Sequence, residues 1–199
     1  MPTFDFKAYV RDKDKRDFRL ILDQPDKCGP NGSAAPHLLI AVKSVAADFD
    51  KRQVVRGTWG REGVFGDALS IRTIFLLGVP KNRTGLPQWD RLLSSESRTF
   101  GDILLWDFDD TFFNLTLKET HFLKWVNRSC PGVSFIFKGD ADVYVNVENI
   151  LEMLRGQRSD ADLFVGDIIV RAKPIRRRSS KYYVPESVYG AALYPAYAG

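Results

Sequence analysis

The segment Ser134-Phe-Ile-Phe-Lys-Gly-Asp-Ala-Asp-Val143 joins an apolar run to two carboxylates. Its first part, residues 134–137, is rich in β-branched and aromatic side chains, which is typical of a buried strand. Asp140 and Asp142 follow this strand directly, where the chain would turn and expose both carboxylates. Hard divalent cations prefer such oxygen ligands, and a nucleotide diphosphate needs such a cation. The spacing alone is a weak signal, because Asp also favours ordinary solvated turns.

Segments typical of buried strands alternate with helical patterns along the rest of the chain. The strand-like segments are residues 37–42, 73–78, 103–106, 134–137 and 164–170. The helical segments are residues 49–59, 87–98, 111–127 and 147–155. This alternation predicts an α/β fold with a mostly parallel sheet flanked by helices. Ligands of such sheets bind beyond the carboxyl ends of the strands, so Lys43 and the aspartate pair could face one crevice.

Apolar periodicity also predicts which side chains of two helices face the core. In the helix over 87–98, Trp89, Leu92 and Leu93 are expected to point inward. In the helix over 111–127, His121 lies among apolar residues at helical spacing. We expect a packed histidine at this position rather than a metal ligand.

The composition is that of an ordinary globular protein, with 199 residues and a hydrophobic content of 44%. A net charge of +4, from 29 basic and 25 acidic residues, is too small to indicate a nucleic-acid partner. The basic stretch 171–181 could be a nucleic-acid patch or a solvated loop, and the lack of interleaved aromatic residues favours the loop. No apolar run reaches the ~18 residues of a membrane span. Residues 1–11 lack the apolar region of a signal peptide.

Cysteine usage and glycosylation sequons indicate the secretory route. Four Asn-x-Ser/Thr sequons occur, at Asn31, Asn82, Asn114 and Asn127. We expect glycans at Asn31, Asn82 and Asn127, whereas Asn114 begins an apolar helix. In an oxidising compartment Cys28 and Cys130 would form a disulfide, and the alternative is two buried free thiols.

Several short motifs occur in an order that is specific to one family. They are residues 17–28, 39–44, 52–60, 75–78, 107–118 and 137–143, followed by Tyr182-Tyr-Val-Pro-Glu186 and Tyr194-Pro-Ala-Tyr-Ala-Gly199. With them, the chain resembles the β-1,3-glycosyltransferases of glycosyltransferase family 31. Within that family it is most similar to the β-1,3-N-acetylglucosaminyltransferases. The resemblance runs from about residue 17 to the last residue.

The resemblance implies a GT-A type fold, a nucleotide-sugar donor, Mn²⁺ and an inverting transfer. The expected reaction moves N-acetylglucosamine from UDP-GlcNAc to the 3-hydroxyl of a galactose-terminated glycan on a glycoprotein or glycolipid. A β-1,3-galactosyltransferase and a non-catalytic nucleotide-sugar or glycan-binding module are the alternatives. Residues 1–36 would be a stem-proximal segment, and residues 37–199 the donor-binding portion of a catalytic domain. The family implies the lumenal side of the Golgi membrane, with an anchor that is not in this chain.

The resemblance also implies roles for the donor-site residues. Asp142, with Asp140 nearby, would hold Mn²⁺ against the leaving diphosphate. Lys43 and Asp110 would be donor contacts, and Asp110 could accept from the uracil N–H or instead cap a helix.

Other roles remain open on the sequence. Arg52 and Arg56 could meet the diphosphate or fix local structure. On the acceptor side, Tyr182 and Tyr194 would contact the glycan, because aromatic rings suit the C–H faces of sugars; the alternative for Tyr182 is a core tyrosine.

The chain departs from the family pattern in two ways. The family usually has three consecutive acids where this chain has Asp140-Ala141-Asp142, but the outer two are kept. The acidic motif that supplies the general base in the family would lie beyond Gly199. We therefore expect residues 1–199 alone not to transfer sugar.

Overall fold

The computed structural model describes residues 7, 17–29, 35–66, 69–81 and 88–198. The chain divides into two compact units, of which one is Arg16–Asp160 and the other contains Ala161–Gly199. The first unit contains the expected sheet, and the second is built mainly of turns.

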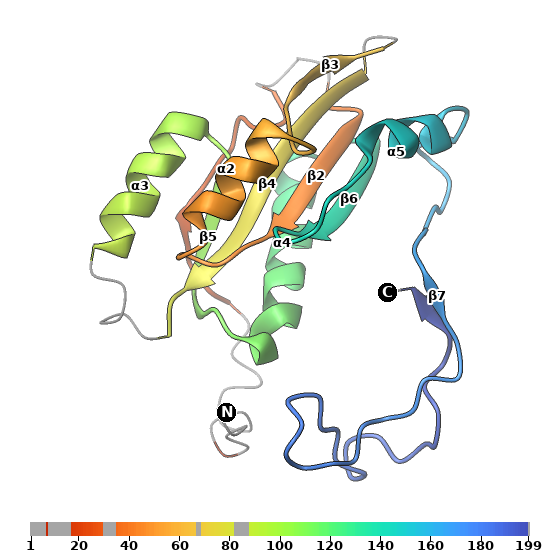
Figure 1. Cartoon of the computed structure of the whole chain (residues 1–199). Coiled ribbons are helices and arrows are strands. Elements are labelled where there is room, and N and C mark those ends of the chain that lie inside the picture. The colour runs from red at the N-terminus through yellow and green to blue at the C-terminus, as the bar shows by residue number, and fades with distance from the viewer. Residues whose placement is uncertain (1–6, 8–16, 30–34, 67–68, 82–87, 199) are drawn as a thin grey trace. The chain divides into compact units, whose positions relative to one another are not determined.

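A six-stranded, mostly parallel sheet forms the first unit (Figure 1). Its strands are β1 (Leu20–Leu22), β2 (Leu38–Lys43), β3 (Gly63–Phe65), β4 (Leu69–Val79), β5 (Ile103–Asp109) and β6 (Phe135–Asp140). The order is β1-β5-β4-β2-β6, with β3 paired to β4. Strands β2, β4, β5 and β6 are parallel, whereas β1 and β3 pair antiparallel to their neighbours. The predicted α/β class is confirmed.

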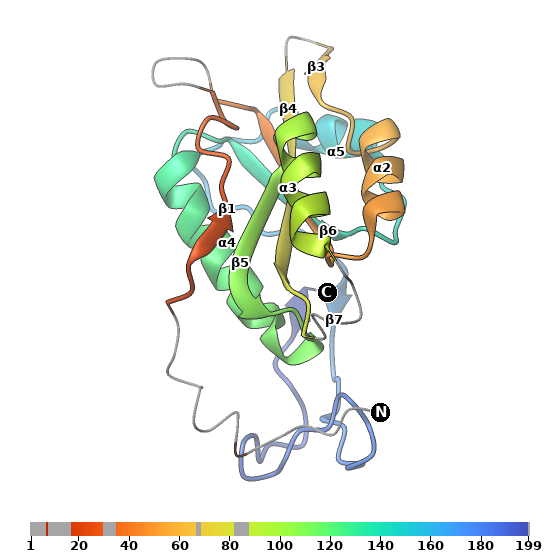
Figure 2. The same ribbon diagram turned by 90° about the vertical axis from the view of Figure 1, so that its left-hand side faces the viewer.

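Helices follow the parallel strands and cover both faces of the sheet. They are α2 (Phe49–Gly57), α3 (Trp89–Phe100), α4 (Leu115–Ser129) and α5 (Val147–Leu154), and a 3₁₀ turn at Phe112–Asn114 leads into α4. Figure 2 shows α4 on the opposite side of the sheet from α2 and α3. Alternate residues of β2 serve the two faces: Ile40 packs in the cluster that contains Val55 and Leu93, and Leu39 packs in the cluster that contains Phe122. Because β2 is buried on both faces, its sequence is a continuous apolar run.

The strand order places a topological switch point between β2 and β6. From β2 the chain winds through β4 to β5 on one side, and it then returns to β6 on the other side of β2. In open α/β sheets the crevice beyond such a switch point is the usual ligand site. The residues that end these two strands, Lys43 and Asp140, are register partners.

The predicted disulfide joins Cys28 to Cys130, whose Cα atoms are 5.3 Å apart. Both cysteines are buried in the cluster beneath α4. The disulfide joins the segment between β1 and β2 to the segment between α4 and β6. The prediction of a disulfide rather than two free thiols is confirmed.

Two predictions about elements need correction in whole or in part, and a third is confirmed. The segment 164–170 contains only the short strand β7 (Ile168–Ile169), which pairs with β8 (Tyr197–Ala198) in the second unit and not with the main sheet. Leu93 is buried as expected, but Leu92 is largely exposed. His121 is confirmed as a packed histidine, since it is buried against aromatic rings that include Phe108.

Candidate functional site

The carboxyl ends of β2 and β6 bring a cation and a carboxylate together at the surface. Lys43 Nζ lies 3.0 Å from Asp140 Oδ1, and the two side chains are 29% and 53% exposed. Just beyond the strands, Ala141 N donates to Lys43 O at 3.2 Å. The ends of both strands are thus fixed to each other while their charged groups remain accessible to a ligand.

The turn after β6 presents the second carboxylate. Asp142 lies in this turn and is exposed. The chain then enters α5, where the side chain of Asn146 caps the helix by accepting from Asn149 N at 3.1 Å. Within the described ranges, no three His, Cys, Asp or Glu side chains gather to hold a metal by themselves. Two carboxylates fit a site in which a substrate's phosphates and water supply most of the ligands.

A buried pair lies behind these strand ends. Lys118 Nζ lies 2.9 Å from Asp110 Oδ1 and 3.0 Å from Asp110 Oδ2, and it donates to Ser44 O at 2.9 Å. Gly78 N also donates to Asp110, at 2.9 Å from Oδ2. Burial lowers the pKa of Lys118, and the charge of Asp110 opposes this effect. Strands β2 and β4, helix α4 and the loop after β5 are therefore joined by one network.

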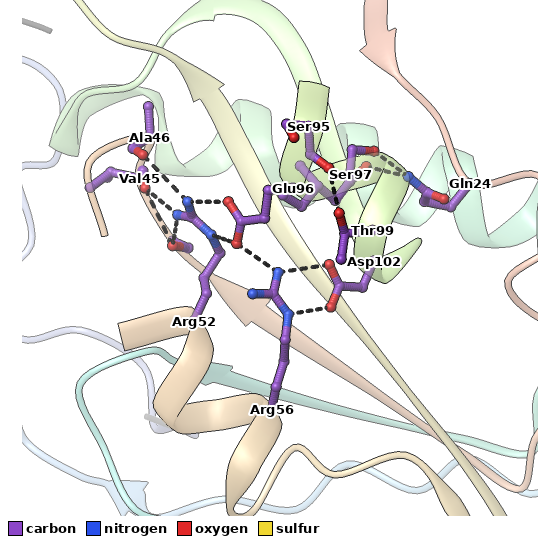
Figure 3. Close-up of polar contacts among 12 residues, drawn as sticks. Gln24, Val45, Ala46, Arg52, Arg56, Ser95, Glu96, Ser97, Thr99 and Asp102 are labelled. Atoms are coloured by element: carbon purple, nitrogen blue, oxygen red, sulfur yellow. Dashed lines mark hydrogen bonds and ion pairs between the residues drawn. The ribbon is translucent and has the colours of Figure 1, made fainter. Parts of the chain in front are cut away.

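A second buried cluster links α2 to α3 and to the start of β5 (Figure 3). Arg52 Nε and Nη2 donate to the two carboxylate oxygens of Glu96 at 2.9 and 2.7 Å. Arg56 Nε and Nη2 donate to Asp102 at 2.6 and 2.9 Å, and Arg56 Nη2 also lies 2.7 Å from Glu96 Oε1. Burial works against the charge of Arg56, but the contacts with Asp102 and Glu96 outweigh it and raise the pKa of the guanidinium. Two arginines and two carboxylates thus balance their charges inside the molecule.

The sequence left two roles open for Arg52 and Arg56: contact with the diphosphate, or a structural role. Their burial and hydrogen bonds fit the structural role. Arg52 is fully buried, and all three of its nitrogen atoms donate to protein groups. Arg56 is mostly buried and also packs over the rings of Phe75 and Phe100. Both positions suit residues that fix local structure.

The structure describes the two residues predicted for acceptor contacts and one of those predicted for glycosylation. Tyr182 and Tyr194 belong to the second unit, where Tyr182 is 51% exposed and Tyr194 packs with its ring centroid 4.9 Å from that of Tyr189. Asn31 and Asn82 lie outside the described residues, and Asn127 is exposed in the last turns of α4.

Sequence reasoning missed the acids that neutralise the arginines. Glu96 and Asp102 are both buried, and Glu96 lies three residues after the buried Leu93 on the same face of α3. An acid on the apolar face of a helix is a signal that a buried cation lies opposite it. The identity of that cation could not be deduced, because Arg52 precedes Glu96 by 44 residues.

None of the described helices is both long enough and apolar enough to cross a membrane. The galactosyltransferase family model matches residues 50–199. The chain is 57% identical to a UDP-GlcNAc:βGal β-1,3-N-acetylglucosaminyltransferase 9 of Bos taurus, over 98% of this chain and 51% of the relative. It is 46% identical to a UDP-GlcNAc:βGal β-1,3-N-acetylglucosaminyltransferase 7 of Rattus norvegicus, over 98% of this chain and 48% of the relative.

A third relative is the N-acetyllactosaminide β-1,3-N-acetylglucosaminyltransferase 2 of Homo sapiens, 45% identical over 98% of this chain and 47% of the relative. The chain therefore spans about half the length of the curated relatives that it matches. The family match covers most of the chain and includes Arg52, Asp110, Asp140 and Asp142, and the fold agrees with it. The chain belongs to the galactosyltransferase family, as its ordered motifs predict.

Proposed function

We propose that this chain is the donor-binding part of an inverting β-1,3-N-acetylglucosaminyltransferase. The reaction would transfer N-acetylglucosamine from UDP-GlcNAc to the 3-hydroxyl of a galactose-terminated glycan. The names of the relatives, which describe β-1,3-N-acetylglucosaminyltransferases, support the donor sugar and the linkage. The observation that carries the proposal is the Lys43–Asp140 pair at the switch point of the sheet, with Asp142 in the turn that follows.

The charges at this point suit a nucleotide diphosphate. Asp142 and Asp140 offer the oxygen ligands for Mn²⁺, and the ammonium group of Lys43 lies beside them. When bound, the metal ion would neutralise charge on the leaving diphosphate. Lys43 would exchange part of its contact with Asp140 for a contact with a phosphate oxygen, because both partners are accessible.

Further roles are proposed for residues of each unit by itself. We assign the uracil N–H to Asp110, since a carboxylate has about four acceptor positions and the described residues make three contacts there. Arg52 and Arg56 would fix the local structure of α2 and α3 rather than meet the diphosphate. On the acceptor side, the exposed ring of Tyr182, with Tyr194, would pack against the C–H face of galactose.

The covalent chemistry supports an oxidising compartment. A disulfide between Cys28 and Cys130 requires oxidising conditions, and the sequons are used in the secretory route. Together with the relatives, this supports a position on the lumenal side of the Golgi membrane.

Calorimetric titration of the 199-residue chain with UDP tests the proposal. We expect saturable binding in the presence of Mn²⁺ and a large loss of binding when a chelator removes the metal. Competition between UDP-GlcNAc and UDP-galactose separates this reaction from that of a β-1,3-galactosyltransferase. UDP binding that is unchanged by the chelator, or no UDP binding at all, would contradict the proposal.

A further inference from the structure

Three residues follow β2 and lead into a turn at Ala46 and Ala47, and one arginine holds them. In this β2 turn, residues 44–46, Arg52 Nη1 donates to the hydroxyl oxygen of Ser44 at 3.0 Å and to the carbonyl oxygen of Val45 at 2.7 Å. Arg52 Nη2 donates to the next carbonyl oxygen, that of Ala46, at 3.4 Å. Figure 3 shows the guanidinium group inserted between this turn and α3. One side chain therefore fixes each residue of the β2 turn.

A second cation fixes the same turn from the other face of the sheet. Lys118, on α4, donates from Nζ to the carbonyl oxygen of Ser44 at 2.9 Å. The backbone N–H of Ser44 donates to Leu76 O on β4 at 3.1 Å. Hydrogen bonds from α2, from α4 and to β4 therefore hold the turn, and they leave its backbone little freedom.

The arginine is itself oriented by a buried carboxylate. Glu96 receives two parallel hydrogen bonds from Arg52, and both side chains are almost completely buried. This two-pronged geometry sets the plane of the guanidinium, so that its remaining N–H groups point at the turn. A lysine at position 52 would keep the charge but not the fork, and it could not serve the carboxylate and the turn together.

The β2 turn begins at the residue after Lys43, whose position matters to the proposed donor site. Lys43 is held on its other side by β6, through Ala141 N and the carboxylate of Asp140. We propose that Arg52 is a positioning residue for donor binding: through the β2 turn it fixes Lys43 against Asp140. This inference rests on the proposed function, in which Lys43 contacts the diphosphate of a uridine nucleotide and Asp140 offers an oxygen ligand to Mn²⁺.

The variant Arg52→Lys tests the inference, with Asp102→Asn as its matched control. Asp102 belongs to the same buried cluster and bonds Arg56, but it makes no contact with the β2 turn. Each variant of the 199-residue chain is titrated with UDP and Mn²⁺ at a temperature where circular dichroism shows it fully folded. We expect Arg52→Lys to weaken UDP binding by about 10–100-fold, the usual effect of losing a group that orients a ligand contact. Asp102→Asn should lower the melting temperature but change the affinity of the folded protein less than about twofold.

The outcomes separate the inference from the function on which it rests. If the unaltered chain does not bind UDP, the proposed function fails and the inference fails with it. If the unaltered chain binds UDP but folded Arg52→Lys binds equally well, or both variants weaken binding equally, only the positioning role is wrong. If Arg52→Lys does not fold, Ser44→Ala decides, because it removes one acceptor of Arg52 without burying a new charge. A loss of about threefold or more in its UDP affinity supports the inference, and an unchanged affinity overturns it.

Discussion

The variant Lys118→Met removes the ammonium group that lies 2.9 Å from one oxygen of Asp110 and 3.0 Å from the other. Methionine has a similar length and shape, so the change in packing is small. The carboxylate of Asp110 is 6% exposed and would keep Gly78 N as a donor, but it would lose the cation beside it. Ser44 O would also lose its bond from Lys118.

The expected loss of stability follows from leaving one member of a buried pair alone. Removing one partner of a buried ion pair typically costs about 3–5 kcal/mol of unfolding free energy, and we expect Lys118→Met to fall in this range. Asp110→Asn should cost a comparable amount, because Lys118 is almost completely buried. The double variant leaves no buried charge in the pair, so it should cost no more than either single variant.

The assay is urea unfolding of the four proteins at neutral pH, monitored by circular dichroism. A second measurement at higher pH adds a check on Asp110→Asn. Burial lowers the pKa of Lys118 and the charge of Asp110 opposes this, so in that variant the pKa should fall further. When the folded-state pKa of a lysine is lowered, stability rises with pH up to the ordinary value of 10.5, because the unfolded chain binds more protons below it. The stability that Asp110→Asn loses relative to the unaltered chain should therefore be smaller at alkaline than at neutral pH. Single-variant losses below about 1 kcal/mol that simply add in the double variant would refute the reasoning, because they describe an exposed pair.

Three further outcomes are expected. The Cys28–Cys130 disulfide closes a loop with a sequence separation of 102, so its reduction should lower the unfolding free energy by up to about 4.7 kcal/mol. If the urea unfolding midpoint is the same with and without reductant, the disulfide is absent. Burial, and then the charge of a nearby lysine, lower the pKa of His121. The native protein should therefore lose stability as the pH drops below the ordinary value of 6.5, because the unfolded chain then binds a proton that the folded chain does not. If a His121→Phe variant lost the same stability over this pH range, His121 would not be the cause. Gly78→Ala should lower the unfolding free energy by about 1–3 kcal/mol, because the added Cβ would lie 2.7 Å from a carbonyl oxygen of β5. Gly57→Ala is the control and should not destabilise the protein, because its Cβ would meet nothing within 4 Å. Equal changes in melting temperature for the two variants would contradict this prediction.

The central strands could be predicted from the sequence because they are buried on both faces. Strand β2 (Leu38–Lys43) is almost entirely buried, so it is a continuous apolar run with the ends close to those expected. Strands β1 and β3 have three residues each and only partly buried side chains, so they carry no clear pattern. The pattern over 164–170 was apolar enough to suggest a strand in the main sheet, but its residues are largely exposed in the second unit.

The site was predictable where residues adjoin strand ends, and not where partners come from distant segments. Lys43 and the aspartates follow buried strands, so their meeting at one edge of the sheet could be anticipated. That Lys43 pairs with Asp140 depends on the β2–β6 register, which no local pattern encodes. The burial of Glu96, rather than Leu92, on α3 depends on the arginines of α2, because a buried cation needs an anion opposite it.

The metal-dependent UDP affinity of Asp142→Asn, compared with that of Ala141→Asp, tests the central claim most directly. Asp142→Asn replaces a charged oxygen ligand with a neutral amide, whereas Ala141→Asp adds an acid between the two proposed ligands and keeps both. We expect Asp142→Asn to weaken Mn²⁺-dependent UDP binding at least about tenfold, and Ala141→Asp to change it much less. Equal binding of UDP by Asp142→Asn and the unaltered chain would contradict the assignment of the strand end after β6 as the donor site.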